Sequence, residues 1–190
     1  LALARQVMAD GAPARLLDTR SPVAPLAAGV ERSIPVPQLA ANGVAVVNLA
    51  AIGGSAAGFL TVKPCGGAQP PTSNLNFAPG QVVSALTAAP LTSGAMCLVS
   101  SVAVDVIVDV TGGFEPTATG RFVASQPFRF LDTRRTDTPW TGRLKPNEPI
   151  DLNVRSIGNV PGDVVGVAFN AAVVDVDGPG FLTLYPCGAV

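Results

Sequence analysis

The chain has 190 residues and a formal net charge of −1, and 13% of its residues are charged, against about 25% in an ordinary globular domain. This balance offers no basic surface for capture of nucleic acid or of an anionic membrane. The sequence contains no histidine, which excludes Ser-His-Asp and Cys-His nucleophilic systems and histidine metal sites. Hydrophobic residues make up 48% of the chain, so we expect it to fold.

In chain order, the sequence predicts short β-strands separated by turn residues. The first lies near residues 5–7, ahead of a Leu-Asp-Thr-Arg motif at 17–20 and a proline-rich turn stretch at 22–37. A β-branched run at 43–49 predicts a buried central strand. Further strands are predicted, in order, at residues 59–64, 73–77, 82–86 and 96–100.

The clearest strand pattern lies at residues 102–110. Every even position is valine, whereas the odd positions are Ala103, Asp105, Ile107 and Asp109. This period of two places one face in a core and excludes a helix. Residues 111–117 break the pattern and are predicted to be a linker. No window shows a capped helical period, so the spacing favours a sandwich or barrel.

The chain repeats itself. Leu-Asp-Thr-Arg returns at residues 131–134, and the Phe-Leu-Thr to Pro-Cys-Gly segment at 59–66 returns at 181–188. Tandem duplication explains why both motifs return in the same order. We predict an all-β chain of tandem β-sandwich units, Ig-like or jelly-roll-like, with domains at 1–116 and 117–190.

The second unit is predicted to hold only the N-terminal half of a repeat. Its central strand is expected at residues 165–171, where Phe169 matches Val47, yet no counterpart of residues 67–116 follows its Pro-Cys-Gly motif. A half-sandwich would expose Phe169 and Phe181. We expect strand addition by other copies of the chain, or by a second chain that completes residues 117–190. The alternative is a fragment whose remaining strands are lost.

Cysteine placement predicts one disulfide and an oxidising compartment. Cys65 and Cys97 both lie in the first unit, and Cys187 matches Cys65 without a later partner. A Cys65–Cys97 bridge would contribute about 3.5–4 kcal/mol in the chain-entropy model; buried free thiols are the alternative. Cys187 is expected to stay unpaired within the chain or to bond to another chain. The prediction is a secreted or cell-surface protein without membrane insertion.

The Leu-Asp-Thr-Arg motif has two interpretations. Arg20 and Arg134 could recognise a sugar or a carboxylate through forked hydrogen bonds. Asp18 and Asp132 could instead close turns with their own backbone, while the arginine pairs with a strand aspartate such as Asp105 or Asp109. The second interpretation, a structural turn with an ion pair, is favoured.

Other polar candidates are few. Asp105 and Asp109 would lie about 13 Å apart along one strand face, too far for a glycosidase pair. Asp175 and Asp177 are candidate calcium ligands, but a solvated hairpin tip is favoured. Trp140, the only tryptophan, could stack on a sugar or pack against a loop. The sequence predicts no catalytic residue and no cofactor.

Together, residues 15–20, 58–66, 73–77 and 105–112 resemble a repeated domain of large secreted and cell-wall-associated proteins of actinobacteria. The resemblance covers residues 14–114 and 128–188. It implies an extracellular repeat, often beside peptidoglycan-active or peptidase domains, without catalytic residues of its own. That unit usually ends in Gly-Tyr-Phe, whereas this chain has Gly-Gly-Phe at 112–114. We therefore predict a structural or adhesive module that builds a filament or surface layer; the alternative is a module that binds cell-wall polysaccharide.

Overall fold

A computed structural model describes residues 5–7, 13–20, 22–116, 120–123, 126–164 and 166–187. The chain divides into two compact units, residues 1–121 and 122–190, and each is considered on its own. Every regular element among the described residues is a β-strand, which confirms the all-β prediction.

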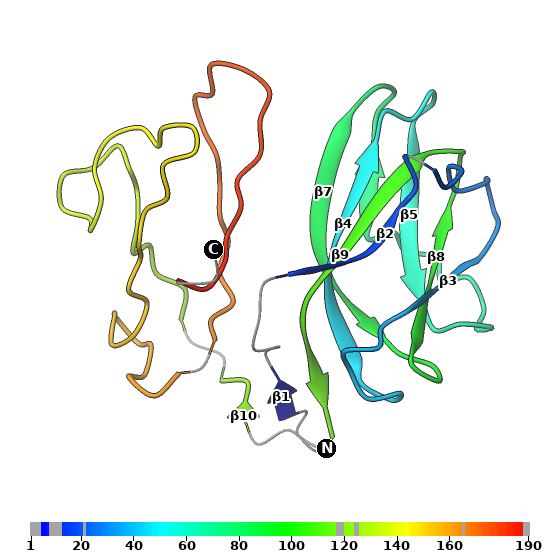
Figure 1. Cartoon of the computed structure of the whole chain (residues 1–190), viewed down its shortest axis with the longest axis horizontal. Helices are drawn as coiled ribbons and strands as arrows, with labels where there is room; N and C mark the ends of the chain where they lie inside the picture. Colours follow the sequence, from blue (N-terminus) through cyan, green and yellow to red (C-terminus); the bar gives the residue numbers. More distant parts are fainter. Residues whose placement is uncertain are drawn as a thin grey trace. The chain divides into compact units, whose positions relative to one another are not determined.

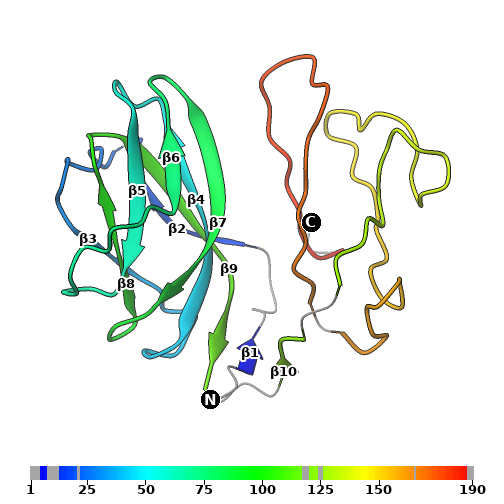
Figure 2. The ribbon, with the colours of Figure 1, turned by 180° about the vertical axis from the view of Figure 1, so that it is seen from behind.

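The first unit consists of two antiparallel sheets packed face to face (Figure 1). The six-stranded sheet has the order β10-β1-β9-β4-β7, with β2 also paired to β9, and the four-stranded sheet has the order β3-β8-β5-β6. Figure 2 shows the smaller sheet from its own side. The strands are β1 (Arg5–Val7), β2 (Ala14–Asp18), β3 (Arg32–Pro35), β4 (Val44–Ile52), β5 (Gly58–Lys63), β6 (Leu75–Phe77), β7 (Val82–Pro90), β8 (Ala95–Ser100), β9 (Asp105–Glu115) and β10 (Gly120–Arg121).

The alternating pattern of β9 determines the position of this strand in the core. Its valines at 106, 108 and 110 are buried, whereas Asp105, Ile107 and Asp109 are half-buried on the opposite face. β9 pairs with β4 along one edge and with β2 and β1 along the other. The strand is therefore central to its sheet, and its two aspartates lie on the outer face beside β2.

Two predictions about the first unit are wrong. Residues 111–115 are not a linker but continue β9, because their backbone pairs with β4 and β1. Gly113 allows this close approach, since a Cβ there would lie 2.7 Å from the Val44 carbonyl oxygen. The proline-rich stretch contains a strand, β3, whose Pro35 lies at the outer edge of the smaller sheet, where the missing N–H is tolerated.

The second unit has no strand among its described residues, so the central strand expected at 165–171 does not form over residues 166–171, and residue 165 lies outside the described residues. The repeat of the β5 segment at 181–187 forms no strand either. The side chain of Val47 in β4 is fully buried, but its counterpart Phe169 is 44% exposed. β4 forms its hydrogen bonds to β7 and β9, whereas no described residue of the second unit lies in a strand that could pair with the segment around Phe169. Phe181 is 95% exposed, but its counterpart Phe59 is also exposed, so Phe181 is not a core position.

Candidate functional site

The Leu-Asp-Thr-Arg motif of the first unit places one carboxylate between two arginines. Asp18 ends β2, and its Oδ2 accepts hydrogen bonds from Arg15 Nη1 at 3.0 Å and from Arg20 Nη2 at 2.6 Å. The backbone N–H of Arg20 also donates to Asp18 Oδ1, at 3.2 Å. Asp18 therefore closes a local turn and holds both guanidinium groups on the sheet surface.

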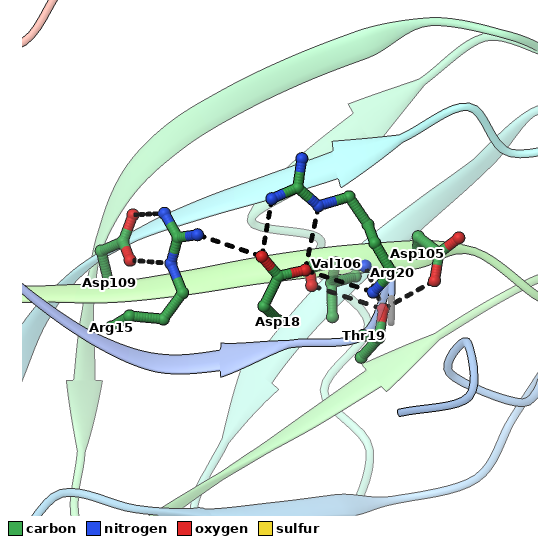
Figure 3. Close-up of polar contacts among 7 residues, drawn as sticks. All are labelled: Arg15, Asp18, Thr19, Arg20, Asp105, Val106 and Asp109. Carbon is green, nitrogen blue, oxygen red and sulfur yellow. Dashed lines mark hydrogen bonds and ion pairs between the residues drawn. The ribbon is translucent and has the colours of Figure 1, made fainter. Parts of the chain in front are cut away.

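Strand β9 provides the other half of this cluster (Figure 3). Arg15 donates from Nε to Asp109 Oδ1 at 2.8 Å and from Nη2 to Asp109 Oδ2 at 3.3 Å, a forked arrangement. Asp109, Arg15, Asp18 and Arg20 thus form a row of alternating charges. The row joins segments more than 90 residues apart in the sequence.

Thr19 is the buried member of the cluster, with 1% of its surface exposed. Its hydroxyl donates to Asp105 Oδ1 at 2.9 Å and accepts from the Val106 N–H at 2.7 Å, while its own N–H donates to the Val106 carbonyl at 3.0 Å. Thr19 thus continues the pairing of β2 with β9 by one residue. Both its hydroxyl and its backbone N–H therefore have hydrogen-bond partners, as a stable buried site requires.

Electrostatics reinforce the charge row. Hydrogen bonds from Arg20 hold the pKa of the Asp18 carboxyl well below its usual range, with a smaller contribution from the Arg15 charge. The Asp109 carboxylate correspondingly raises the pKa of Arg15. Asp18 therefore stays ionised and paired near neutral pH, and does not have the raised pKa of a general acid.

The partners differ from those expected from the sequence. Arg20 pairs with Asp18 of its own motif rather than with Asp105 or Asp109. The arginine that reaches Asp109 is Arg15, which the sequence analysis did not select. A signal for it exists, because an arginine three residues before the aspartate occurs in both repeats, as Arg15 and Arg129.

The second unit forms the same turn. Asp132 Oδ2 accepts from Arg129 Nη1 and from Arg134 Nη2, both at 2.9 Å, and the Arg134 N–H donates to Asp132 Oδ1 at 3.2 Å, as in the first unit. Hydrogen bonds from Arg134 hold the pKa of Asp132 well below its usual range. Neither the Thr133 hydroxyl nor its N–H hydrogen-bonds to a described residue, in contrast to Thr19. A cavity of about 160 Å³ adjoins the turn, lined by Arg129, Phe130, Arg135, Asp137 and Thr138.

The three other candidate ligand residues make hydrogen bonds within the chain, two of them through backbone carbonyls. Arg143 Nη2 donates to Asp177 Oδ1 at 3.1 Å and to the Asp175 carbonyl. A guanidinium group therefore lies beside the two candidate calcium ligands. Trp140 is 41% exposed, and its carbonyl accepts from the Thr138 hydroxyl at 3.0 Å.

Cys65 and Cys97 form a disulfide, which confirms that prediction, and Cys187 is an exposed thiol. Beside the disulfide, the buried Lys63 pairs with Glu31 and donates to the Gly67 carbonyl at 2.5 Å. Within the described part of the chain, Glu31, Cys65 and Cys97 are the only group spaced for a metal ion. The sulfurs of Cys65 and Cys97 are bonded to each other, and the Glu31 carboxylate is paired with Lys63. These atoms are therefore engaged in contacts that hold the first unit together.

Comparisons of the chain with protein-family models, with curated proteins and with solved structures give no significant match. Among the described residues, no helix has the length and apolar character needed to cross a membrane. The disulfide is typical of an oxidising compartment.

Proposed function

We propose that this chain is a non-catalytic, extracellular structural or adhesive module that assembles into a filament or surface layer by strand addition between chains. One observation carries the proposal: the second unit keeps the turn of the repeat but leaves core positions in solvent. Leu182 is 44% exposed, whereas its counterpart Leu60 is fully buried in β5. Added strands would cover such positions.

The polar clusters support a non-catalytic role. In the first unit, each carboxylate of the candidate site is held by an arginine or a threonine, and no histidine is present in the sequence. A general base or nucleophile needs an available lone pair near a substrate. A resemblance to cell-wall-associated repeats, together with the disulfide, supports an extracellular location.

Sedimentation velocity over a range of protein concentrations tests assembly. The full chain should form concentration-dependent oligomers, and Leu182→Ser should weaken them because a serine removes apolar surface from the contact. Val30→Ser is the matched control, since Val30 is 57% exposed in the first unit. A strictly monomeric chain, or equal effects of the two substitutions, would contradict the proposal.

Binding of cell-wall polysaccharide is the second candidate function. The exposed Trp140 and the polar cavity lined by Arg129 and Thr138 both belong to the second unit, and an exposed indole can stack on a sugar ring. A pull-down with insoluble peptidoglycan tests this function. Retention of the chain that is lost in Trp140→Ala would favour it over the structural role.

A further inference from the structure

We propose that the first unit pairs with a second copy of itself through the free edge of β7, so that the larger sheets of two chains join across a two-fold axis. β7 is the last strand of this sheet and, among the described residues, pairs only with β4 (Figure 1). The inference concerns the first unit and goes beyond the proposed function, which rests on the second unit.

The register of β7 against β4 determines which backbone groups of β7 point away from the sheet. At one end of the pair the Gly53 N–H donates to the Gln81 carbonyl at 3.0 Å, and at the other the Leu91 N–H donates to the Gly43 carbonyl at 2.9 Å. The register continues between these ends without a shift. Hydrogen-bonded and non-hydrogen-bonded positions alternate in an antiparallel pair, so the even-numbered residues of β7 direct their backbone groups outward. The outward N–H groups are those of Val82, Ser84, Leu86 and Ala88.

The other free sheet edges in the described part of the first unit are short, charged or irregular. β6 has three residues and β10 has two. β3 contains Arg32 and Pro35, and β2 contains Arg15, Asp18 and a register shift. Natural proteins use such features to keep sheet edges from pairing with other chains. β7 has nine residues, no charged side chain and its only proline at the last position, so it lacks this protection.

A second copy of β7 is the occupant that fits this edge. In an antiparallel pair with two-fold symmetry, each outward N–H meets a carbonyl of the same strand in the other copy, so the edge is its own complement. No like charges meet, because β7 is uncharged. Leu86 lies near the middle of the strand and is 61% exposed. The two copies of Leu86 would lie directly or diagonally opposite each other, within reach of long side chains.

Sedimentation velocity of the full chain over a range of concentrations measures the pairing. Leu86→Lys should weaken dimerisation by about tenfold or more, because like charges repel across the axis and a lysine protects a sheet edge. Val30→Lys is the matched control, since Val30 is 57% exposed in the first unit outside β7. It should leave the dimer unchanged. Both variants should keep the thermal midpoint of the native chain, because both side chains are exposed.

A charge exchange tests whether the partner is a second copy. Leu86→Glu alone should also weaken dimerisation, but an equimolar mixture of Leu86→Lys and Leu86→Glu should restore it, because opposite charges then meet across the axis. Ser84→Pro tests the backbone pairing. It removes an outward N–H but no hydrogen bond to β4, so it should weaken the dimer while circular dichroism shows a folded chain.

A monomeric chain, native dimerisation of Leu86→Lys, or a mixture that fails to restore the dimer would overturn the proposal. Comparison with Leu182→Ser separates this contact from the proposed function. If only Leu182→Ser weakens association, the β7 contact is wrong and the proposed function stands. If only Leu86→Lys weakens it, the β7 contact stands and the proposed role of the second unit is wrong.

Discussion

Thr19 and Asp105 lie 86 residues apart in the sequence, and the Thr19 hydroxyl donates a 2.9 Å hydrogen bond to the Asp105 carboxylate. The same hydroxyl accepts from the Val106 N–H, so one side chain ties β2 to the central strand of the sheet. In the first unit, the motif threonine is thus part of a long-range contact as well as of a turn.

Thr19→Val should lower the free energy of unfolding by about 1–3 kcal/mol, because it leaves a buried N–H and a carboxylate without their partner. Urea denaturation followed by circular dichroism measures the loss. Thr19→Ser keeps the hydroxyl and should lose much less. Equal stability of Thr19→Val and the native chain would show that the hydroxyl contributes nothing.

The forked ion pair between Arg15 and Asp109 should contribute about 0.2–1 kcal/mol to the free energy of unfolding, as expected for a partly exposed ion pair. Arg15→Gln, Asp109→Asn and the double variant form a thermodynamic cycle that isolates the pair energy. The effect should shrink in 1 M salt, since screening weakens exposed charges. Strictly additive losses would mean that the two charges do not interact.

Gly113→Ala should destabilise the first unit by about 1–3 kcal/mol, the usual cost of overpacking. The added Cβ would lie 2.7 Å from the Val44 carbonyl oxygen and would also contact Leu39. Gly178→Ala is the control, because nothing lies within 4 Å of a Cβ there. Thermal unfolding compares the two. An unchanged midpoint for Gly113→Ala would favour a loose linker over a continued strand.

The sequence was sufficient to predict elements whose pattern repeats over several residues. The valine alternation at 102–110 placed the buried face of β9, and the paired positions of Cys65 and Cys97 in the first unit gave the disulfide. β3 was missed because Pro35 and the prolines around this strand are typical of turns, although an edge strand tolerates a proline. The end of β9 was missed because Gly112 and Gly113 resemble a linker, and the close contacts at Gly113 depend on tertiary packing.

The candidate site was only partly predictable. The residue types of Leu-Asp-Thr-Arg indicated a turn with an ion pair, but several acidic residues could reach each arginine, and spacing alone does not choose among them. The register of β2 against β9, with a shift between Arg15 and Leu17, decides that Arg15 meets Asp109. The pairing of Lys63 with Glu31 is also a result of tertiary packing that no motif indicated.

Low pH should lower the stability of the first unit, because the Asp18 carboxylate becomes protonated. The folded state holds the pKa of this carboxyl below its unfolded value of about 3.9, so its ionised form favours folding above that pH. This contribution should disappear as the pH falls from about 4 toward the lower folded pKa. The native chain should therefore be more stable than Asp18→Asn at neutral pH, and the gap should close on acidification.

Urea titrations at several pH values between 7 and 2.5 measure the gap. Asp163→Asn serves as control, at an aspartate without an ion pair to a described residue. A gap between the native chain and Asp18→Asn that stays constant, or widens, as the pH falls would contradict the role assigned to the Arg20 and Arg15 contacts.

Hydrogen exchange of the backbone amides at residues 166–187, measured by mass spectrometry, tests the central claim that added strands complete the second unit. In the dilute monomeric chain these amides should exchange rapidly, because this segment forms no strand. On assembly, their exchange should slow by about a hundredfold, as new strand pairing protects them. Slow exchange in the monomer, or exchange that remains fast in the assembled state, would contradict the account.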